Sequence, residues 1–216
     1  MERLGGDVQR LLGLQLTSEQ NRAFQIYYQE LKTWNARFNL TAITDPEGVQ
    51  IRHFLDSLSC LLAVDANLRG QCLIDVGSGA GFPGLPLKIA CPDLRVTLLE
   101  ATRKKTGFLQ HIVERLKLSD VSIIHARAEQ IGQAPQHREV YDWVVARAVA
   151  TMPTLVEYLL PLCRIGGHCL AQKGEAAAAE VATAESAIKL LGGRLCRLVP
   201  VELPGLAETR HLVLID

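Results

Sequence analysis

The chain has 216 residues, of which 48% are hydrophobic, so it can bury a full core in one domain with an attached subdomain. Its 23 basic and 23 acidic residues give zero net charge, which excludes a global attraction to naked nucleic acid or to an anionic membrane. No apolar run approaches the roughly 18 residues of a membrane-spanning helix, so we expect no membrane role. Six scattered cysteines, without a C-x-x-C pair or a signal peptide, indicate reduced thiols in the cytoplasm and no metal site.

The first seventy residues are predicted to be helical. Thr17 and Gln20 have the spacing of a capping box, and apolar residues then recur every three or four positions, which predicts a helix of about five turns. Asp45-Pro46 is a typical start of a second helix. Arg52 and His53 lie on the polar side of that helix, where a solvated face is the simplest interpretation.

From residue 72 the pattern changes to alternating strands and helices. A short apolar run, Leu73–Val76, predicts a buried strand, and four glycines follow it within eight residues. The segment Gly79–Gly84 matches the dinucleotide fingerprint G-x-G-x-x-G. We therefore expect residues 1–70 to form a helical subdomain and residues 71–216 to form a second domain that binds a ligand at this loop.

Two features of the glycine loop argue against a dinucleotide. Pro83 and Pro86 lack the N–H groups that a pyrophosphate needs at the N-terminus of a helix. Asp75, placed just before the glycines, suits a positively charged ligand better than a polyanion. S-adenosylmethionine is nucleoside-like, positively charged and free of phosphate, so we predict that Asp75, Gly77, Gly79 and Gly81 bind it. The alternative is a glycine-rich turn without a ligand.

The next two predicted strands are also followed by carboxylates. The strand at 95–100 ends in Glu100, which lies 21 residues after Gly79, close to the roughly 20-residue offset at which an acidic residue binds a ribose hydroxyl. Glu129 follows the strand at 121–125. Because the carboxyl ends of parallel strands share one edge, we expect Asp75, Glu100 and Glu129 to surround one nucleoside.

The remaining pattern completes an α/β sheet. The expected elements are a strand at 141–146, a helix at 152–164, a turn at Gly166-Gly167, a strand at 168–172 and two antiparallel strands at 194–203 and 209–215. This alternation predicts the Rossmann-like fold of class I S-adenosylmethionine-dependent methyltransferases. Its sheet has seven strands, mostly parallel, and closes with an antiparallel C-terminal hairpin.

The turn after the predicted fourth strand carries Arg147 and bears on the methyl acceptor. It lacks the Pro-Pro-aromatic arrangement used for exocyclic amines and the Pro-Cys nucleophile used for pyrimidine carbons. This favours an acceptor such as N7 of guanine, which has a free lone pair, so that positioning alone can suffice and no general base is expected. Arg147 and Lys173 are interpreted either as ligands of phosphate or of the cofactor carboxylate, or as ordinary surface cations.

Several motifs lie in order along nearly the whole chain. They are Asn39–Thr41, Arg52–Ser57, Ile74–Gly84, Ala101–Lys105, Arg147, Lys173-Gly174 and Arg210-His211. Together they resemble the bacterial ribosomal RNA small subunit methyltransferase G family, also called the glucose-inhibited division protein B family. The helical Arg-His-x-Leu-Asp-Ser run at 52–57 is the most specific of them.

The resemblance implies methyl transfer from S-adenosylmethionine to N7 of a guanine in 16S rRNA, in a loop near the decoding site of the small ribosomal subunit. The cofactor contacts that it implies are Gly77, Phe82, Glu100, Ala101, Thr102, Ala128, Glu129 and Arg147. The resemblance also changes the interpretation of the polar side of the second helix, which it places on the RNA-facing surface. The RNA contacts that it favours are Arg52, His53, Lys104, Lys105 and Lys173. We expect a cytoplasmic monomer.

Two other classes of function are compatible with the sequence. A small-molecule methyltransferase shares the sheet and the loop, although it has no need of basic residues on both sides of the site. A non-catalytic regulator that binds a nucleotide is the second. Neither needs an RNA substrate.

Overall fold

A seven-stranded sheet forms the centre of the protein, whose computed structural model describes residues 3–64 and 68–216. The strands are β1 (Cys72–Val76), β2 (Arg95–Glu100), β3 (Val121–His125), β4 (Tyr141–Arg147), β5 (Cys163–Lys173), β6 (Leu195–Val201) and β7 (Arg210–Ile215). Their spatial order is β3-β2-β1-β4-β5-β7-β6, and only β7 runs antiparallel to its neighbours β5 and β6. This confirms the predicted sheet and its C-terminal hairpin.

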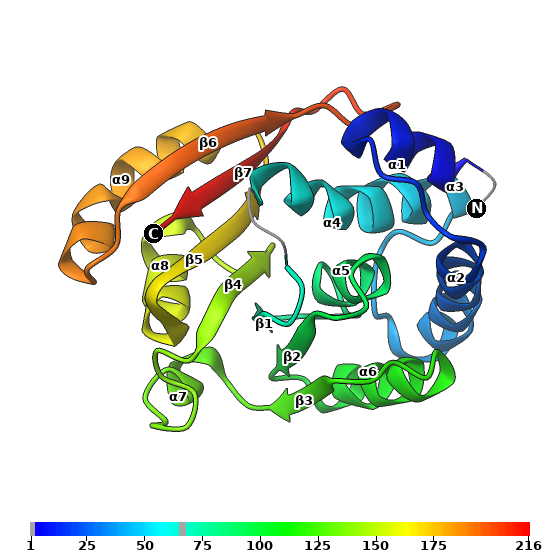
Figure 1. Ribbon diagram of the computed structural model, residues 1–216, viewed down its shortest axis with the longest axis horizontal. Helices are drawn as coiled ribbons and strands as arrows, with labels where there is room; N and C mark the ends of the chain where they lie inside the picture. The colour runs from blue at the N-terminus through cyan, green and yellow to red at the C-terminus, as the bar shows by residue number, and fades with distance from the viewer. Residues whose placement is uncertain (1–2, 65–67) are drawn as a thin grey trace.

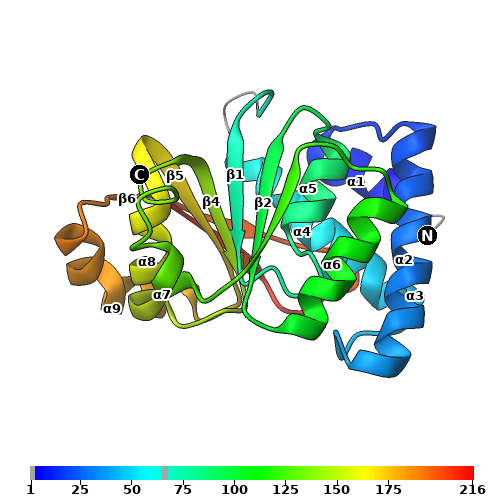
Figure 2. The same cartoon turned by 90° about the horizontal axis from the view of Figure 1, so that it is seen from below.

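Helices cover both faces of the sheet (Figures 1 and 2). One face carries α1 (Leu4–Leu12), α2 (Ser18–Phe38), α3 (Pro46–Gly48), the π-helix η1 (Val49–Leu55), α4 (Asp56–Leu58), the 3-10 helix η2 (Ser59–Ala63), α5 (Gly84–Ala90) and α6 (Arg103–Arg115). The other carries α7 (Ala128–Ile131), α8 (Met152–Leu159), the 3-10 helix η3 (Leu160–Leu162) and α9 (Ala177–Leu190). Parallel strands need such cover because they are buried on both sides.

The two helix starts predicted in the N-terminal part are confirmed. The Thr17 side chain accepts a hydrogen bond from the Gln20 N–H at 3.2 Å, and the Gln20 side chain accepts one from the Thr17 N–H at 2.8 Å, which completes the capping box of α2. The Asp45 carboxylate accepts a hydrogen bond from the Gly48 N–H at 2.6 Å. Both signals are local, which is why the sequence reveals them.

The second helix differs from a regular α-helix. Between Val49 and Leu55 the backbone widens into the π-helix η1, and every residue of this segment except Arg52 is buried. The apolar positions of the segment fit either helical period, so the spacing did not distinguish the two. Such π segments are common at functional sites.

The predicted turn at Gly166-Gly167 is wrong, because both residues lie inside β5. The preceding helix is also shorter than predicted, ending at Leu159 with a 3-10 turn that contains Pro161. A side chain at Gly167 would come within 2.9 Å of the Asp142 carbonyl oxygen on β4. The glycine is therefore needed for the close approach of two strands.

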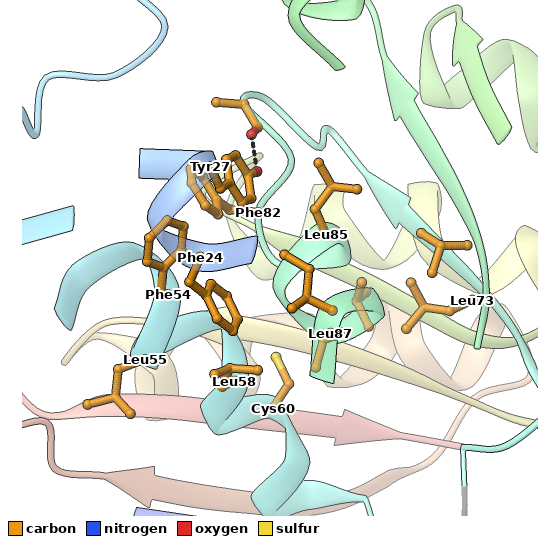
Figure 3. Packing of buried hydrophobic residues seen from close by; sticks show 14 of the residues in the cluster. Phe24, Tyr27, Phe54, Leu55, Leu58, Cys60, Leu73, Phe82, Leu85 and Leu87 are labelled. Carbon is orange, nitrogen blue, oxygen red and sulfur yellow. Dashed lines mark hydrogen bonds between the residues drawn. The ribbon is translucent and has the colours of Figure 1, made fainter. Parts of the chain in front are cut away.

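The N-terminal helices and the sheet share one hydrophobic core (Figure 3). Phe24 of α2 packs against Phe54 of η1 with ring centroids 5.0 Å apart, and Tyr27 stacks on Phe82 of the glycine loop at 5.4 Å. Leu85 of α5 belongs to the same cluster. The division at residue 70 stays a prediction, but the helical part does bury its apolar face against the sheet.

Candidate active site

The glycine loop begins directly after β1, at the carboxyl edge of the sheet. The N–H groups of Gly77 and Ser78 both donate to the Leu99 carbonyl, at 2.8 and 3.0 Å, and this fixes the loop beside β2. Gly79 has φ of +60°, and a side chain there would meet only the Gly77 carbonyl oxygen, at 3.9 Å. At Gly79 the loop therefore offers bare backbone to an open space, as a nucleoside ligand requires.

Glu100 at the end of β2 supports this loop from the neighbouring strand. Its carboxylate accepts hydrogen bonds from the Gly79 N–H at 2.9 Å and from the Thr102 N–H at 2.7 Å, one on each oxygen. A carboxylate oxygen can accept more than one hydrogen bond, so ribose hydroxyls still fit there. Ala101, which follows, is exposed, and its carbonyl is hydrogen-bonded to His125 at the end of β3.

Asp75 lies in the interior, behind the glycine loop. Its side chain is fully buried, and one carboxylate oxygen accepts a hydrogen bond from the Gly84 N–H at 2.8 Å. Burial raises the pKa of Asp75 to about 7, although the Gly84 N–H and the charge of Arg147 act in the opposite direction. The predicted direct contact with a cationic ligand needs this correction, because Asp75 instead holds the loop against the start of α5.

The predicted contacts Ala128 and Glu129 lie at the start of α7, just beyond β3. Glu129 is exposed, and a hydrogen bond from Tyr158 of α8 to this carboxylate raises the pKa of Tyr158. Because β3 runs parallel to β2 and lies next to it, α7 begins at the same carboxyl edge of the sheet as Glu100. Of the three predicted acidic residues, Glu129 is thus exposed at that edge, Glu100 is only 5% exposed, and Asp75 is fully buried.

Phe82 of the loop is held between aromatic rings. His53 stacks on one side with centroids 4.5 Å apart, and Tyr27 is stacked at 5.4 Å. The Arg147 guanidinium lies 5.1 Å from the centre of the same ring. Since the Phe82 side chain is buried, only its backbone is placed to contact a cofactor.

Arg147 links the turn after β4 to the N-terminal helices. It donates hydrogen bonds to the Asp56 carboxylate at 2.8 Å and to the Arg52 carbonyl at 3.0 Å. Its second nitrogen lies 3.3 Å from Nδ1 of His53, which must accept because a guanidinium only donates. The sequence places Asp56 on the polar side of the second helix, in a solvated helical pair with an arginine, and assigns it no role in the site; the structure instead pairs it with Arg147.

His53 is therefore a neutral, internal residue. Its Nε2 bears the proton and donates to the Thr41 hydroxyl at 2.8 Å. Burial and then the charge of Arg147 lower its pKa to about 3. His53 is only 7% exposed, although it lines the cleft at the carboxyl ends of β4 and β5, and its predicted RNA contact stays a prediction; its neighbour Arg52 is exposed.

A cleft of about 450 Å³ opens at the carboxyl ends of β4 and β5. Its lining includes Arg52, Asp56, Arg147, Gln172, Lys173 and Arg210. Lys173 is largely buried, and its ammonium donates to the Ala150 carbonyl at 2.5 Å and to Glu180 at 2.7 Å. Lys173 lines the cleft with its charge already paired to Glu180, and its predicted contact with RNA phosphate stays a prediction.

The other predicted cations, Lys104 and Lys105, lie in the first turn of α6. Lys104 is exposed and Lys105 half-buried. Thr102 occupies the cap position of this helix, but its side chain makes no capping hydrogen bond. Its backbone N–H donates to Glu100. The chain therefore has cations on two sides of the glycine loop, at Arg52 and at the start of α6.

The sheet order, the glycine loop and the acidic end of β2 define a class I S-adenosylmethionine-dependent methyltransferase. Solved structures of that class have the same fold. TYW2 from M. jannaschii, in complex with AdoMet, superposes with a TM-score of 0.60 at 16% identity, covering 81% of this chain and 77% of that one. A SAM-dependent methyltransferase from Aquifex aeolicus gives 0.57 at 16% identity, over 79% and 93%.

The chain belongs to the ribosomal RNA small subunit methyltransferase G family. The model of that family matches residues 20–213. Ribosomal RNA small subunit methyltransferase G of Roseiflexus sp. (strain RS-1) is 56% identical over 207 residues, covering 95% of this chain and 87% of its own. The enzyme of Chloroflexus aggregans is 50% identical over 217 residues, covering 97% and 90%. The resemblance found in the motifs is thus confirmed.

Proposed function

We infer that this protein transfers a methyl group from S-adenosylmethionine to N7 of a guanine in the 16S rRNA of the small ribosomal subunit. The observation that carries this conclusion is membership of the methyltransferase G family across residues 20–213. The geometry supports it, since His53 and Arg147, which line the cleft together with Arg52, contact Phe82 of the glycine loop.

The residues around the loop suit the cofactor. The backbone of Gly79 faces the open space, and Glu100 is in place for the ribose hydroxyls. Ala101, Thr102, Ala128 and Glu129 follow the ends of β2 and β3, and we assign them to the adenine side of the ligand. When bound, S-adenosylmethionine supplies the electrophilic methyl group.

The cleft suits an acceptor that needs positioning more than acid–base chemistry. Guanine N7 has a lone pair and no proton to remove, so the chain needs no general base. Methylation gives the ring a positive charge, which an unpaired arginine would oppose. The Asp56 carboxylate, 2.8 Å from Arg147, offsets that arginine charge.

Replacement of Glu100 by alanine is expected to weaken S-adenosylmethionine binding 10- to 100-fold, as measured by calorimetry. Two N–H groups of the loop and of α6 lose their acceptor, and the ribose loses a charged hydrogen bond worth about 1–3 kcal/mol. Glu114→Ala on the exposed side of α6 is the control and leaves the affinity unchanged. Unchanged affinity in the Glu100 variant would remove the ribose assignment.

Arg52→Ala is expected to lower kcat/KM for methylation of small subunits by about tenfold, while the cofactor affinity stays within twofold. The side chain is exposed, and its backbone carbonyl, which binds Arg147, is retained in the variant. Lys189→Ala, an exposed cation on α9, serves as the matched control. A normal rate for the Arg52 variant contradicts an RNA contact there.

The modified base, the oligomeric state and the cellular location are parts of the same proposal. We place the guanine in a loop of the decoding region and propose a cytoplasmic monomer. No helix in the described residues is long and apolar enough to span a membrane.

Labelled-methyl transfer to small subunits that lack the modification, followed by mapping of the methylated base, tests the proposal directly. Transfer to metabolites and not to RNA would instead support a small-molecule methyltransferase. Purified protein that retains NAD and not S-adenosylmethionine would support a nucleotide-binding regulator.

A further inference from the structure

The cleft contains two polar atoms that are buried and have no hydrogen-bond partner, Oε1 of Gln172 and Nε of Arg210. Gln172 is only 6% exposed, so its amide oxygen cannot rely on bulk water. A buried acceptor without a donor costs free energy, and such groups in native proteins call for an explanation. One orphaned acceptor and one orphaned donor in the same cleft point to a polar ligand that supplies both partners.

The orientation of the Gln172 amide is fixed by its other end. Its Nε2 donates to the backbone carbonyl of Asp56 at 2.6 Å. That carbonyl cannot donate, so the amide nitrogen must face it and the oxygen must be turned away from it. The same contact ties Gln172 to the helix that follows Arg52.

Gln172 lies at the carboxyl end of β5, opposite Arg147 on β4 and Leu212 on β7. The glycine loop leaves the end of β1, which is the strand on the other side of β4. Neighbouring strands are about 4.8 Å apart, so Gln172 is roughly 10 Å from the strand that delivers the cofactor loop. A purine that directs N7 toward β1 presents its Watson–Crick edge toward β5.

We propose that Gln172 is a specificity residue that reads the acceptor base. Its Oε1 accepts a hydrogen bond from the N1–H or N2–H group of guanine, and the Nε–H of Arg210 donates to O6. Adenine presents the opposite pattern, with an amino group in place of O6 and a lone pair in place of N1–H. The inference rests on the proposed function and deepens it, since it assigns the recognition of guanine to residues of this chain.

The first test compares two glutamine-to-methionine variants, both assayed on small subunits that lack the modification. Gln172→Met keeps the volume and removes the amide, and it is expected to lower kcat/KM 10- to 100-fold while the affinity for S-adenosylmethionine stays within twofold. Gln71→Met is the matched control, because Gln71 accepts a hydrogen bond from Trp143 at the opposite end of the sheet. It is expected to retain normal kcat/KM.

The second test changes the base, so that it depends on the folded wild-type enzyme. Subunits are assembled with inosine, which lacks the 2-amino group, or with N1-methylguanine, which lacks N1–H and keeps O6, at the target position. For the wild-type enzyme, kcat/KM is expected to be at least tenfold lower with one of these bases than with guanine. For Gln172→Met, the same replacement of guanine is expected to lower kcat/KM less than threefold. Such non-additivity is the mark of a direct contact.

The outcomes separate this inference from the function on which it rests. Wild-type enzyme that transfers no methyl group to small subunits overturns the proposed function. Two results overturn the reading of the base by Gln172 and leave the methyltransferase assignment intact. One is an active wild-type enzyme with the same kcat/KM for guanine and for both base analogues. The other is a Gln172 variant that loses as much kcat/KM as the wild-type enzyme does when guanine is replaced by an analogue.

Discussion

Replacement of Gly81 by alanine is expected to abolish measurable S-adenosylmethionine binding and to lower the free energy of unfolding by about 2–5 kcal/mol. Gly81 has φ of +98°, and an added Cβ would overlap the Tyr27 hydroxyl and approach Leu85 to 2.5 Å. The Tyr27 hydroxyl cannot move away freely, because it donates to the Ala80 carbonyl at 2.5 Å from a fully buried position. The loop must therefore shift.

Thermal melting and calorimetry check this expectation together. A loss of 2–5 kcal/mol corresponds to a fall of roughly 5–15 °C in melting temperature for a chain of this size. Gly13→Ala is the control, since Gly13 also has a positive φ, of +65°, but no atom lies within 4 Å of the added Cβ. Equal effects of the two variants would mean that backbone strain alone, and not the contact with Tyr27, limits position 81.

Asp56→Ala is expected to destabilise the protein by about 3–5 kcal/mol and to abolish methylation. It removes the carboxylate from a buried ion pair and leaves the Arg147 guanidinium, whose side chain is only 15% exposed, without its counterion. That cation then lies beside the cleft and opposes the positive charge that develops on a methylated guanine. Chemical denaturation and the labelled-methyl assay measure the two effects.

An exposed ion pair of similar length provides the control for Asp56. Lys189 and Glu185 lie 2.7 Å apart on the surface of α9, and Glu185→Ala is expected to leave stability and activity unchanged, because water screens the pair. If the Asp56 variant proves as stable as the Glu185 variant, the Arg147 charge is solvated by other means. The ion pair that joins Arg147, after β4, to Asp56 of the N-terminal helices would then contribute less stability than its geometry indicates.

The features that the sequence predicted correctly have local causes. The capping box at Thr17, the cap at Asp45 and the glycine loop each depend on residues within a few positions of one another. The order of the strands and the offset of Glu100 follow from the regular geometry of α/β units. These signals suffice for the class of fold and for the cofactor.

The features that the sequence did not predict depend on packing between distant segments. His53 was expected on the polar, solvated side of its helix, but stacking on Phe82 and contact with Arg147 bury it. Asp75 was expected beside the ligand, yet its partner is Gly84 at the start of the next helix. No sequence pattern predicts a role for Gln172, because only its surroundings in the sheet show that its amide oxygen is buried without a hydrogen-bond partner.

The core that joins the N-terminal helices to the sheet also sets a limit on redesign. Tyr27 both fills that core and hydrogen-bonds the backbone of the glycine loop, so the helical part does two tasks at once (Figure 3). Grafting a foreign N-terminal region onto this sheet would uncover Phe82 and Leu85 and release the loop. Substrate range in this fold thus cannot be exchanged as a separate module, since any new helical part must also rebuild the support of the cofactor site.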